Sequence, residues 1–148
     1  LAWYPHNAVQ IMKEPIKAGK SDLATFLQNY EEVRSKTFIG HVRWGNVGGK
    51  NYSNTHPFGR EYNGIDYSFA HNGTVSTDNL SQDYFKPVGS TDSERAFCHL
   101  MNEIKRDGIS RLSESHFDRI AEILMEINRN GDFNCIFSDS LRIISTYI

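Results

Sequence analysis

The chain has 148 residues, with 16 Lys and Arg against 18 Asp and Glu, so its formal net charge is −2 at pH 7. This length suits one domain, and the near balance of charge excludes the basic surface that nucleic acid or an anionic membrane would need. No apolar run reaches the roughly 20 residues that span a bilayer, and the two cysteines form no metal or disulfide motif. We therefore expect a single cytoplasmic domain whose partner is a small molecule or another protein.

The first 44 residues predict a hairpin, a helix and a further strand. Residues 1–4 and 8–13 flank a turn at residues 5–7, and the second segment alternates in the manner of a strand. Ser21 is a typical helix N-cap, and an apolar stripe at helical spacing follows it and should pack on a sheet. The stripe consists of Leu23, Phe26, Leu27, Tyr30 and Val33. Residues 38–44 predict the next strand.

Two long segments rich in Gly, Asn and Ser lie on either side of a strand predicted at residues 65–71. They cover residues 45–64 and 72–89, and both are predicted to be loops. Loops of this length in a compact domain usually carry function.

The last third of the chain predicts two helices and a hairpin. Thr91, with Glu94 three residues later, indicates a capping box at the start of a helix. Its buried side consists of Phe97, Leu100, Met101 and Ile104. A second helix begins at Ser113 and ends at Gly131, and its apolar side consists of Phe117, Ile120, Ile123, Leu124 and Ile127. Residues 133–139 and 141–148 then form a hairpin, so strands precede and follow a block of helices, which is typical of an α+β fold.

Arg43 lies inside an apolar run, FIGHVRWGN, at residues 38–46. Strand periodicity places it on one face with Ile39 and His41. Because arginine is rarely buried without a partner, Arg43 should bind either a carboxylate of the protein or a carboxylate of a ligand. From this strand alone, the ion pair within the protein is the default explanation.

The segment AHNG, residues 70–73, allows two interpretations. Asn-Gly is the strongest short hairpin signal, so a plain turn is favoured when the segment is considered alone. The Asn72 side-chain amide and the Gly73 backbone N–H could instead present two donors to a developing oxyanion, because glycine lets the backbone approach a substrate closely.

Asp92 stands at the first helical position after Thr91, where the helix dipole alone would favour an acid. The functional alternative is that Asp92 binds a substrate ammonium group and complements a carboxylate bound by Arg43. Together with Asn72 and Gly73, these residues would recognise an amino acid and support attack on its side-chain carbonyl.

Four motifs, HVRWG, NTHPF, FAHNGTV and GSTDSE, follow one another between residues 41 and 94. With these motifs the chain resembles the class II glutamine amidotransferase domain, a member of the N-terminal-nucleophile hydrolases, over roughly residues 1–140. It is most similar to the stand-alone branch that includes γ-glutamyl hydrolases of thiol metabolism. The resemblance implies a four-layer αββα sandwich of two antiparallel sheets flanked by helices, of which residues 1–148 would be an incomplete copy.

The resemblance also implies the site. Arg43 would bind the α-carboxylate of glutamine or of a γ-glutamyl compound, and Asp92 would bind the α-ammonium group. Asn72 and Gly73 would form the oxyanion hole. Five further residues would border or support the pocket: Trp44, Asn46, Gly48, His41 and His56. No metal or other cofactor is implied.

In this family a cysteine at the mature N-terminus attacks the amide, its own α-amine serves as the base, and a thioester forms with release of ammonia. Residue 1 is Leu. Cys135 is predicted to face a core, and Cys98 is predicted to lie on a helix near its apolar side, so neither can replace the nucleophile. The chain as it stands is therefore expected to be inactive. We expect a preceding segment that carries the cysteine and further sequence after residue 148, with a natural pseudoenzyme as the alternative.

Other hypotheses stay open. His41, His56 and His71 could form the zinc site of a metal hydrolase, although no H-E-x-x-H motif supports it. A non-catalytic domain could bind glutamine or a γ-glutamyl compound and regulate a partner. A purely structural module would leave the candidate residues unrelated. The sequence specifies neither the acceptor of the ammonia nor whether the protein works alone, as a homodimer or with a partner subunit.

Overall fold

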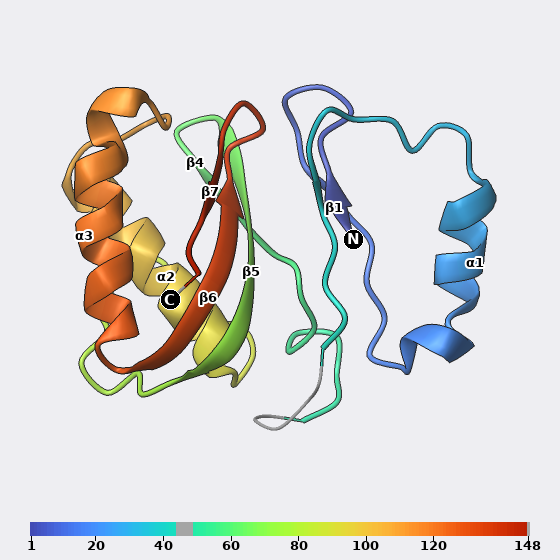
Figure 1. Ribbon diagram of the computed structural model, residues 1–148, viewed down its shortest axis with the longest axis horizontal. Coiled ribbons are helices and arrows are strands. Elements are labelled where there is room, and N and C mark those ends of the chain that lie inside the picture. Colours follow the sequence, from blue (N-terminus) through green and yellow to red (C-terminus); the bar gives the residue numbers. More distant parts are fainter. Residues whose placement is uncertain (44–48, 148) are drawn as a thin grey trace.

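The computed structural model describes residues 1–43 and 49–147, and it contains two antiparallel sheets between layers of helices (Figure 1). One sheet has three strands in the order β2–β1–β3, and the other has four in the order β4–β5–β6–β7. The strands are β1 (Ala2–Trp3), β2 (Gln10–Ile11), β3 (Phe38–Ile39), β4 (Phe58–Tyr62), β5 (Ile65–Val75), β6 (Gly131–Ser138) and β7 (Ile143–Ser145). The α+β class and the four-layer arrangement predicted from the sequence are confirmed.

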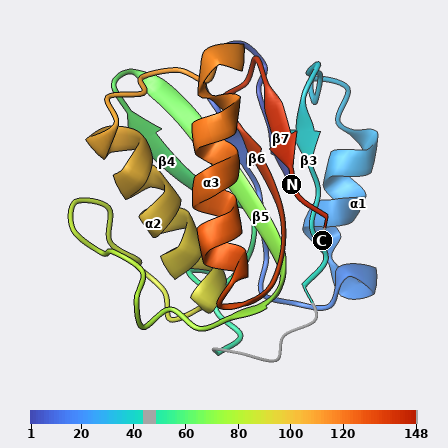
Figure 2. The same cartoon turned by 60° about the vertical axis from the view of Figure 1, so that its left-hand side comes forward.

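The helices form the two outer layers. α2 (Asp92–Arg106) and α3 (Phe117–Asn128) cover the outer face of the four-stranded sheet, and α1 (Asp22–Asn29) lies beyond the three-stranded sheet (Figures 1 and 2). Single 3₁₀ turns at Ala18–Lys20 and Glu114–His116 precede α1 and α3. None of the helices in the described part of the chain is long and apolar enough to cross a membrane.

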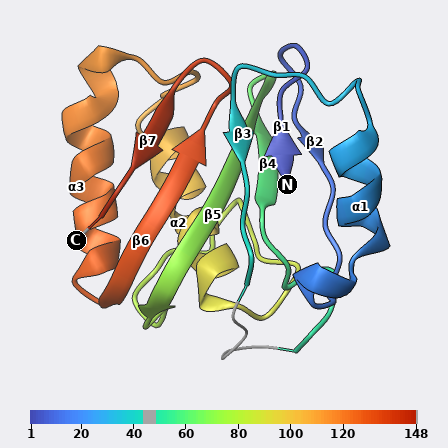
Figure 3. The same ribbon diagram turned by 45° about the vertical axis from the view of Figure 1, so that its right-hand side comes forward.

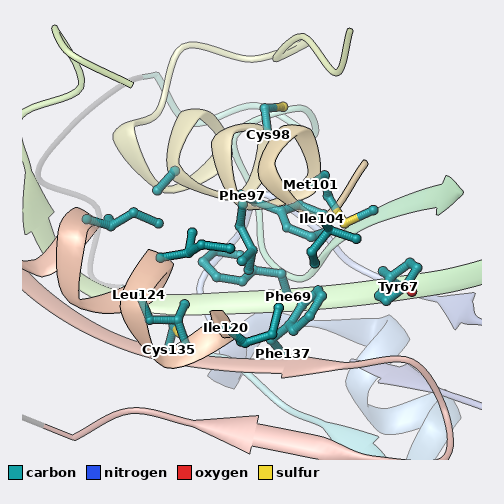
Figure 4. Close-up of a cluster of buried hydrophobic side chains, with 14 of the residues drawn as sticks. Tyr67, Phe69, Phe97, Cys98, Met101, Ile104, Ile120, Leu124, Cys135 and Phe137 are labelled. Atoms are coloured by element: carbon teal, nitrogen blue, oxygen red, sulfur yellow. The ribbon is translucent and has the colours of Figure 1, made fainter. Parts of the chain in front are cut away.

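The main core lies between the four-stranded sheet and the helices α2 and α3 (Figure 4). The apolar sides predicted for both helices are buried there, except that Phe117 at the start of α3 is 40% exposed. Phe69 of β5 stacks on Phe97 of α2 with ring centroids 4.9 Å apart. The cysteines Cys98 and Cys135 are buried, as predicted, and Cys98 lies on the opposite side of α2 from Phe97 (Figure 4).

Two sequence predictions about the hairpins are wrong. Residues 58–62, assigned to a loop, form β4, because this segment pairs with β5 along its whole length. The turn between β4 and β5 is Asn63–Gly64, whose φ angles of 53° and 74° suit a two-residue hairpin. Residues 72–75, assigned to the second loop, belong to β5. Asn72 and Gly73 face residues 133 and 134 of β6, so the plain turn, one of the two interpretations of this Asn-Gly pair, does not form.

The N-terminal helix α1 begins where the sequence predicts, since the Ser21 Oγ accepts the N–H of Ala24 at 2.9 Å. The predicted packing of its apolar stripe on a sheet is wrong for the described residues, because no residue of α1 is buried and Phe26 is 51% exposed. The strands β1, β2 and β3 have two residues each. Strands this short present at most one outward side chain each and cannot cover a helix.

The two sheets are held face to face by a small apolar cluster and a buried tyrosine. Ala2, Ile39 and Ala70 form a second buried cluster between them. The Tyr4 hydroxyl donates to the backbone carbonyl of Ser138 at 2.9 Å and lies 2.7 Å from the Ser68 Oγ. These contacts hold β1 and β3 against the four-stranded sheet, and Figure 3 shows the two sheets packed on each other.

Candidate active site

The end of β5 carries Asn72 and Gly73. Asn72 is exposed, and no hydrogen bond to its side-chain amide occurs within residues 1–43 and 49–147. Gly73 has a φ of 143°, which disfavours any side chain. A Cβ at this position would overlap the backbone carbonyl of Asp132 and would lie 2.9 Å from Nε2 of His71. Glycine is therefore required at residue 73 by both its backbone conformation and its neighbours.

The N-terminus of α2 docks beside this strand end. Oδ2 of Asp92 accepts the backbone N–H of Val75 at 3.0 Å. The Ser93 Oγ lies 2.9 Å from Nδ1 of His71, whose Nε2 donates to the carbonyl of Asp132 at 3.2 Å. With Nε2 as the donor in a neutral ring, Nδ1 accepts the Ser93 hydroxyl. Two hydrogen bonds thus fix Asp92 and Ser93 relative to Asn72 and Gly73.

The predicted capping box at α2 is only half formed. The Thr91 Oγ1 accepts the N–H of Glu94 at 3.2 Å, as predicted. The Glu94 carboxylate does not return to Thr91, because it accepts the N–H of Val88 and of Gly89 and forms a 2.6 Å ion pair with Arg60. The Glu94 carboxylate therefore binds the loop that precedes α2.

His41 and Arg43 approach the site from the other sheet. Regular pairing of β3 ends at Ile39, but the predicted alternation continues, with Val42 78% exposed and both His41 and Arg43 half-buried. Nε2 of His41 donates to the backbone carbonyl of His71 at 3.1 Å. This bond ties the segment that carries Arg43 to the strand that carries Asn72.

His56 completes this side of the site. Nζ of Lys13 donates to the carbonyls of Thr55 and Pro57 at 2.7 and 3.2 Å and so holds the chain on both sides of His56. The His56 ring is 4% exposed and stacks on His41 with centroids 4.2 Å apart. Neither of its ring nitrogens has a hydrogen-bond partner in the described part of the chain.

A cavity of about 290 Å³ lies between these groups. The structure brings together on its wall five of the residues that the sequence predicts: Arg43, His56, Asn72, Gly73 and Asp92. The predicted support His41 also lines it, as does His71, which the sequence suggested only as a zinc ligand. Ser93 and Asp132 line it too, and no sequence pattern indicated either of them. Trp44, Asn46 and Gly48 lie outside the described residues.

The three histidines of the cavity are neutral at pH 7. The pKa of His56 is lowered to about 2, mainly by burial and in part by positive charge at His41, His71 and Arg43. Burial also lowers the pKa of His41 and of His71. Although these rings share one cavity, the described residues contain no group of three or more His, Cys, Asp or Glu placed to hold a metal ion.

Neither cysteine of the chain lines this cavity. Burial raises the pKa of the Cys135 thiol to about 11, and it raises the pKa of Cys98 as well. Both thiols are therefore protonated at pH 7 and are poor nucleophiles.

The fold is α+β, with a polar cavity between its two sheets and the start of α2. Residues 1–147 match the family of class II glutamine amidotransferases, and the chain belongs to this family.

Similar proteins agree with this family. The chain is 41% identical over 140 residues to an uncharacterized protein of Methanocaldococcus jannaschii, a match that covers 94% of this chain and 39% of that protein. It is 33% identical over 141 residues to a Haemophilus influenzae protein named "Putative glutamine amidotransferase", covering 94% of this chain and 48% of that protein. The chain thus spans less than half the length of these two relatives.

A solved structure is similar as well. It is a crystal structure titled "predicted glutamine amidotransferase" from Pseudomonas aeruginosa, with a TM-score of 0.55 and 37% sequence identity. The match covers 60% of this chain and 35% of that chain.

We expect acid to destabilise the fold through His56. Because its pKa in the folded chain lies below the ordinary 6.5, the unfolded chain binds more protons between these two values. The free energy of unfolding therefore decreases as the pH is lowered through this window, by up to about 1.4 kcal/mol per pH unit for one such histidine. Urea unfolding of His56→Asn should show a shallower pH dependence below about pH 6.5. His6→Asn, which removes an exposed histidine, should leave the dependence as steep as in the wild type, and an unchanged slope in His56→Asn would contradict the prediction.

Proposed function

We propose that the cavity binds glutamine or a γ-glutamyl compound and supports hydrolysis of its amide to glutamate and ammonia or an amine. The observation that carries this proposal is that Arg43, Asn72, Gly73 and Asp92, which are far apart in the sequence, line one cavity. The cavity offers a guanidinium and a carboxylate for the two charged groups of an amino acid, and it offers an amide donor for a carbonyl oxygen.

In the proposed mechanism, Arg43 binds the α-carboxylate and Asp92 binds the α-ammonium group. Oδ2 of Asp92 accepts the Val75 N–H, so the carboxylate is held in one orientation. The substrate side chain then reaches Asn72 and Gly73, whose N–H groups stabilise the negative charge that develops on the amide oxygen. The nucleophile is proposed to be an N-terminal cysteine of the kind that this family uses, which forms a thioester that water resolves.

The first experiment measures ammonia and glutamate release by the full-length natural protein supplied with glutamine. We expect stoichiometric release of both products. Binding of glutamine without any release would favour the non-catalytic alternative, and the absence of binding and of release would overturn the proposal.

The Arg43→Ala variant tests the binding mode. Because Arg43 holds the carboxylate equally in the ground state and the transition state, its loss should raise KM with little change in kcat. A hydrogen bond to a charged group contributes about 1.5–3 kcal/mol, so KM should rise about 10- to 100-fold. Arg43→Lys should recover part of this loss, because lysine keeps the charge but not the planar fork.

Arg34→Ala serves as the matched control, since Arg34 is exposed and its guanidinium donates, among the described residues, only to the carbonyl of Glu31. Steady-state kinetics with glutamine should give wild-type values for this variant. An unchanged KM in Arg43→Ala would show that the pocket assignment is wrong.

A further inference from the structure

Two loops that border the candidate site meet at the side chain of Asn54. They are residues 49–57 and residues 86–91, and neither contains a helix or a strand. Asn54 is completely buried. Its Oδ1 accepts the N–H of Ser90 at 2.8 Å, and its Nδ2 donates to the Ser90 Oγ at 3.2 Å and to the carbonyl of Gly49 at 3.0 Å. One amide group therefore ties the two loops together.

The second loop is also held from the side of α2. Oε2 of Glu94 accepts the N–H of Gly89 at 2.6 Å, and the carboxylate is itself paired with Arg60. A Cβ on Gly89 would overlap Oδ1 of Asn54 and would lie 3.0 Å from Oε2 of Glu94. The backbone at Gly89 thus passes through a gap that fits only glycine, with Asn54 on one side and Glu94 on the other.

The bonds between Asn54 and Ser90 lie close to the cavity along both loops. Ser90 precedes Asp92 by two residues, and His56 follows Asn54 by two residues. Both Asp92 and His56 line the cavity. Neither loop belongs to a sheet ladder. The bonds of Asn54 therefore help to set the distance across the cavity between Asp92 and His56, in addition to the bond that Asp92 accepts from Val75.

We propose that Asn54 is a positioning residue that sets the place of the Asp92 carboxylate in the cavity and thereby determines the preference for substrates with an α-ammonium group. This inference rests on the proposed function of the cavity. It assigns to Asn54 a part in substrate selectivity that is separate from the binding of the α-carboxylate by Arg43.

The experiment compares two substrates of the full-length natural protein. One is glutamine, and the other is glutaramate, which is glutamine without its α-amino group. The wild type should prefer glutamine, and Asp92→Asn should reduce this preference. Asn54→Ala should lower the ratio of the two kcat/KM values by about tenfold, the usual effect of a weakened hydrogen bond to a charged group. The kcat/KM for glutaramate should stay nearly unchanged.

Two further variants keep the test decisive if Asn54→Ala folds poorly. Asn54→Asp keeps the acceptor for Ser90 but loses both Nδ2 donations, and Gly89→Ala places a Cβ against Oδ1 of Asn54 and forces the loops apart while residue 54 stays an asparagine. Both should lower the selectivity ratio. Asn51→Ala is the matched control, because among the described residues Oδ1 of Asn51 accepts only from Ser53 and Asn54, within its own loop. This variant should keep the wild-type ratio.

Each outcome has a distinct meaning. An equal loss of kcat/KM on both substrates would show a merely structural role and would overturn the positioning proposal, as would an unchanged ratio in the Asn54 variants. A wild type that hydrolyses both substrates equally well would overturn the assignment of Asp92 and, with it, this inference. A wild type that neither binds nor hydrolyses glutamine would instead overturn the proposed function itself.

Discussion

Replacing Asn72 by Ala should lower kcat for glutamine hydrolysis by about 10²- to 10³-fold, the usual effect of losing one oxyanion donor. The amide oxygen gains most of its negative charge in the transition state, so the loss should fall on kcat while KM changes little. The Asn72 side chain is exposed at the cavity wall and makes no hydrogen bond with other described residues. The free energy of unfolding should therefore stay close to the wild-type value.

A second variant at residue 72 and a control variant elsewhere separate the catalytic effect of Asn72 from an effect on stability. Asn72→Asp has nearly the same shape, but a carboxylate repels a developing oxyanion, so its kcat should fall at least as far as that of Asn72→Ala. Asn29→Ala removes an exposed asparagine at the end of α1 and should keep full activity. The measurements are ammonia release and urea unfolding of all three variants. A wild-type rate in Asn72→Ala would remove this residue from its proposed role.

Local signals in the sequence predicted much of the fold. Ser21 and Thr91 cap helices as predicted, because N-capping depends on residues only three positions apart. The apolar spacing in α2 and α3 predicted the buried faces for the same reason. The continuation of the β3 alternation to Arg43 was also predictable, since strand periodicity is a local property.

The errors lie where distant segments decide the structure. The sequence has two Asn-Gly pairs, and only pairing with β6, about sixty residues further along the chain, makes residues 72–73 part of a strand instead of a turn. β4 carries Arg60 and Glu61 in a half-buried edge strand, so it lacks the apolar alternation that marks a strand. The exposure of α1 depends on the size of the neighbouring sheet, which its own residues do not encode.

In the candidate site, too, the sequence predicted the member residues but not the long-range contacts that hold them. The order of the motifs predicted Arg43, His56, Asn72, Gly73 and Asp92 as members of one pocket, and the structure places all five on one cavity. Their chemical roles stay predictions. The bonds that hold them, such as those between His71 and Ser93, join residues more than twenty positions apart and involve common polar side chains. No short sequence pattern distinguishes such a pair from solvent-exposed residues, and only the packing of α2 against β5 brings the two together.

The Gly73→Ala variant should combine a large loss of stability with a large loss of activity. An alanine at a φ of 143° is strained, and its Cβ would overlap the carbonyl of Asp132 in the neighbouring strand β6. Backbone strain and overpacking each cost about 1–3 kcal/mol, so the free energy of unfolding should fall by about 2–6 kcal/mol. Relief of the overlap would move the backbone N–H of residue 73 and break the bond from His71 Nε2 to Asp132. We therefore expect kcat to fall by about 10²-fold or more.

Gly64→Ala is the matched control, because Gly64 also has a positive φ, of 74°, but a Cβ at this position would meet no atom within 4 Å. It lies in the β4–β5 turn and does not line the cavity. Its cost should be limited to backbone strain of about 1–2 kcal/mol, with full activity retained. Urea unfolding and ammonia release measured on both variants give the comparison. If Gly73→Ala lost no more stability than Gly64→Ala, the close approach of β5 to β6 would not be what requires glycine at residue 73.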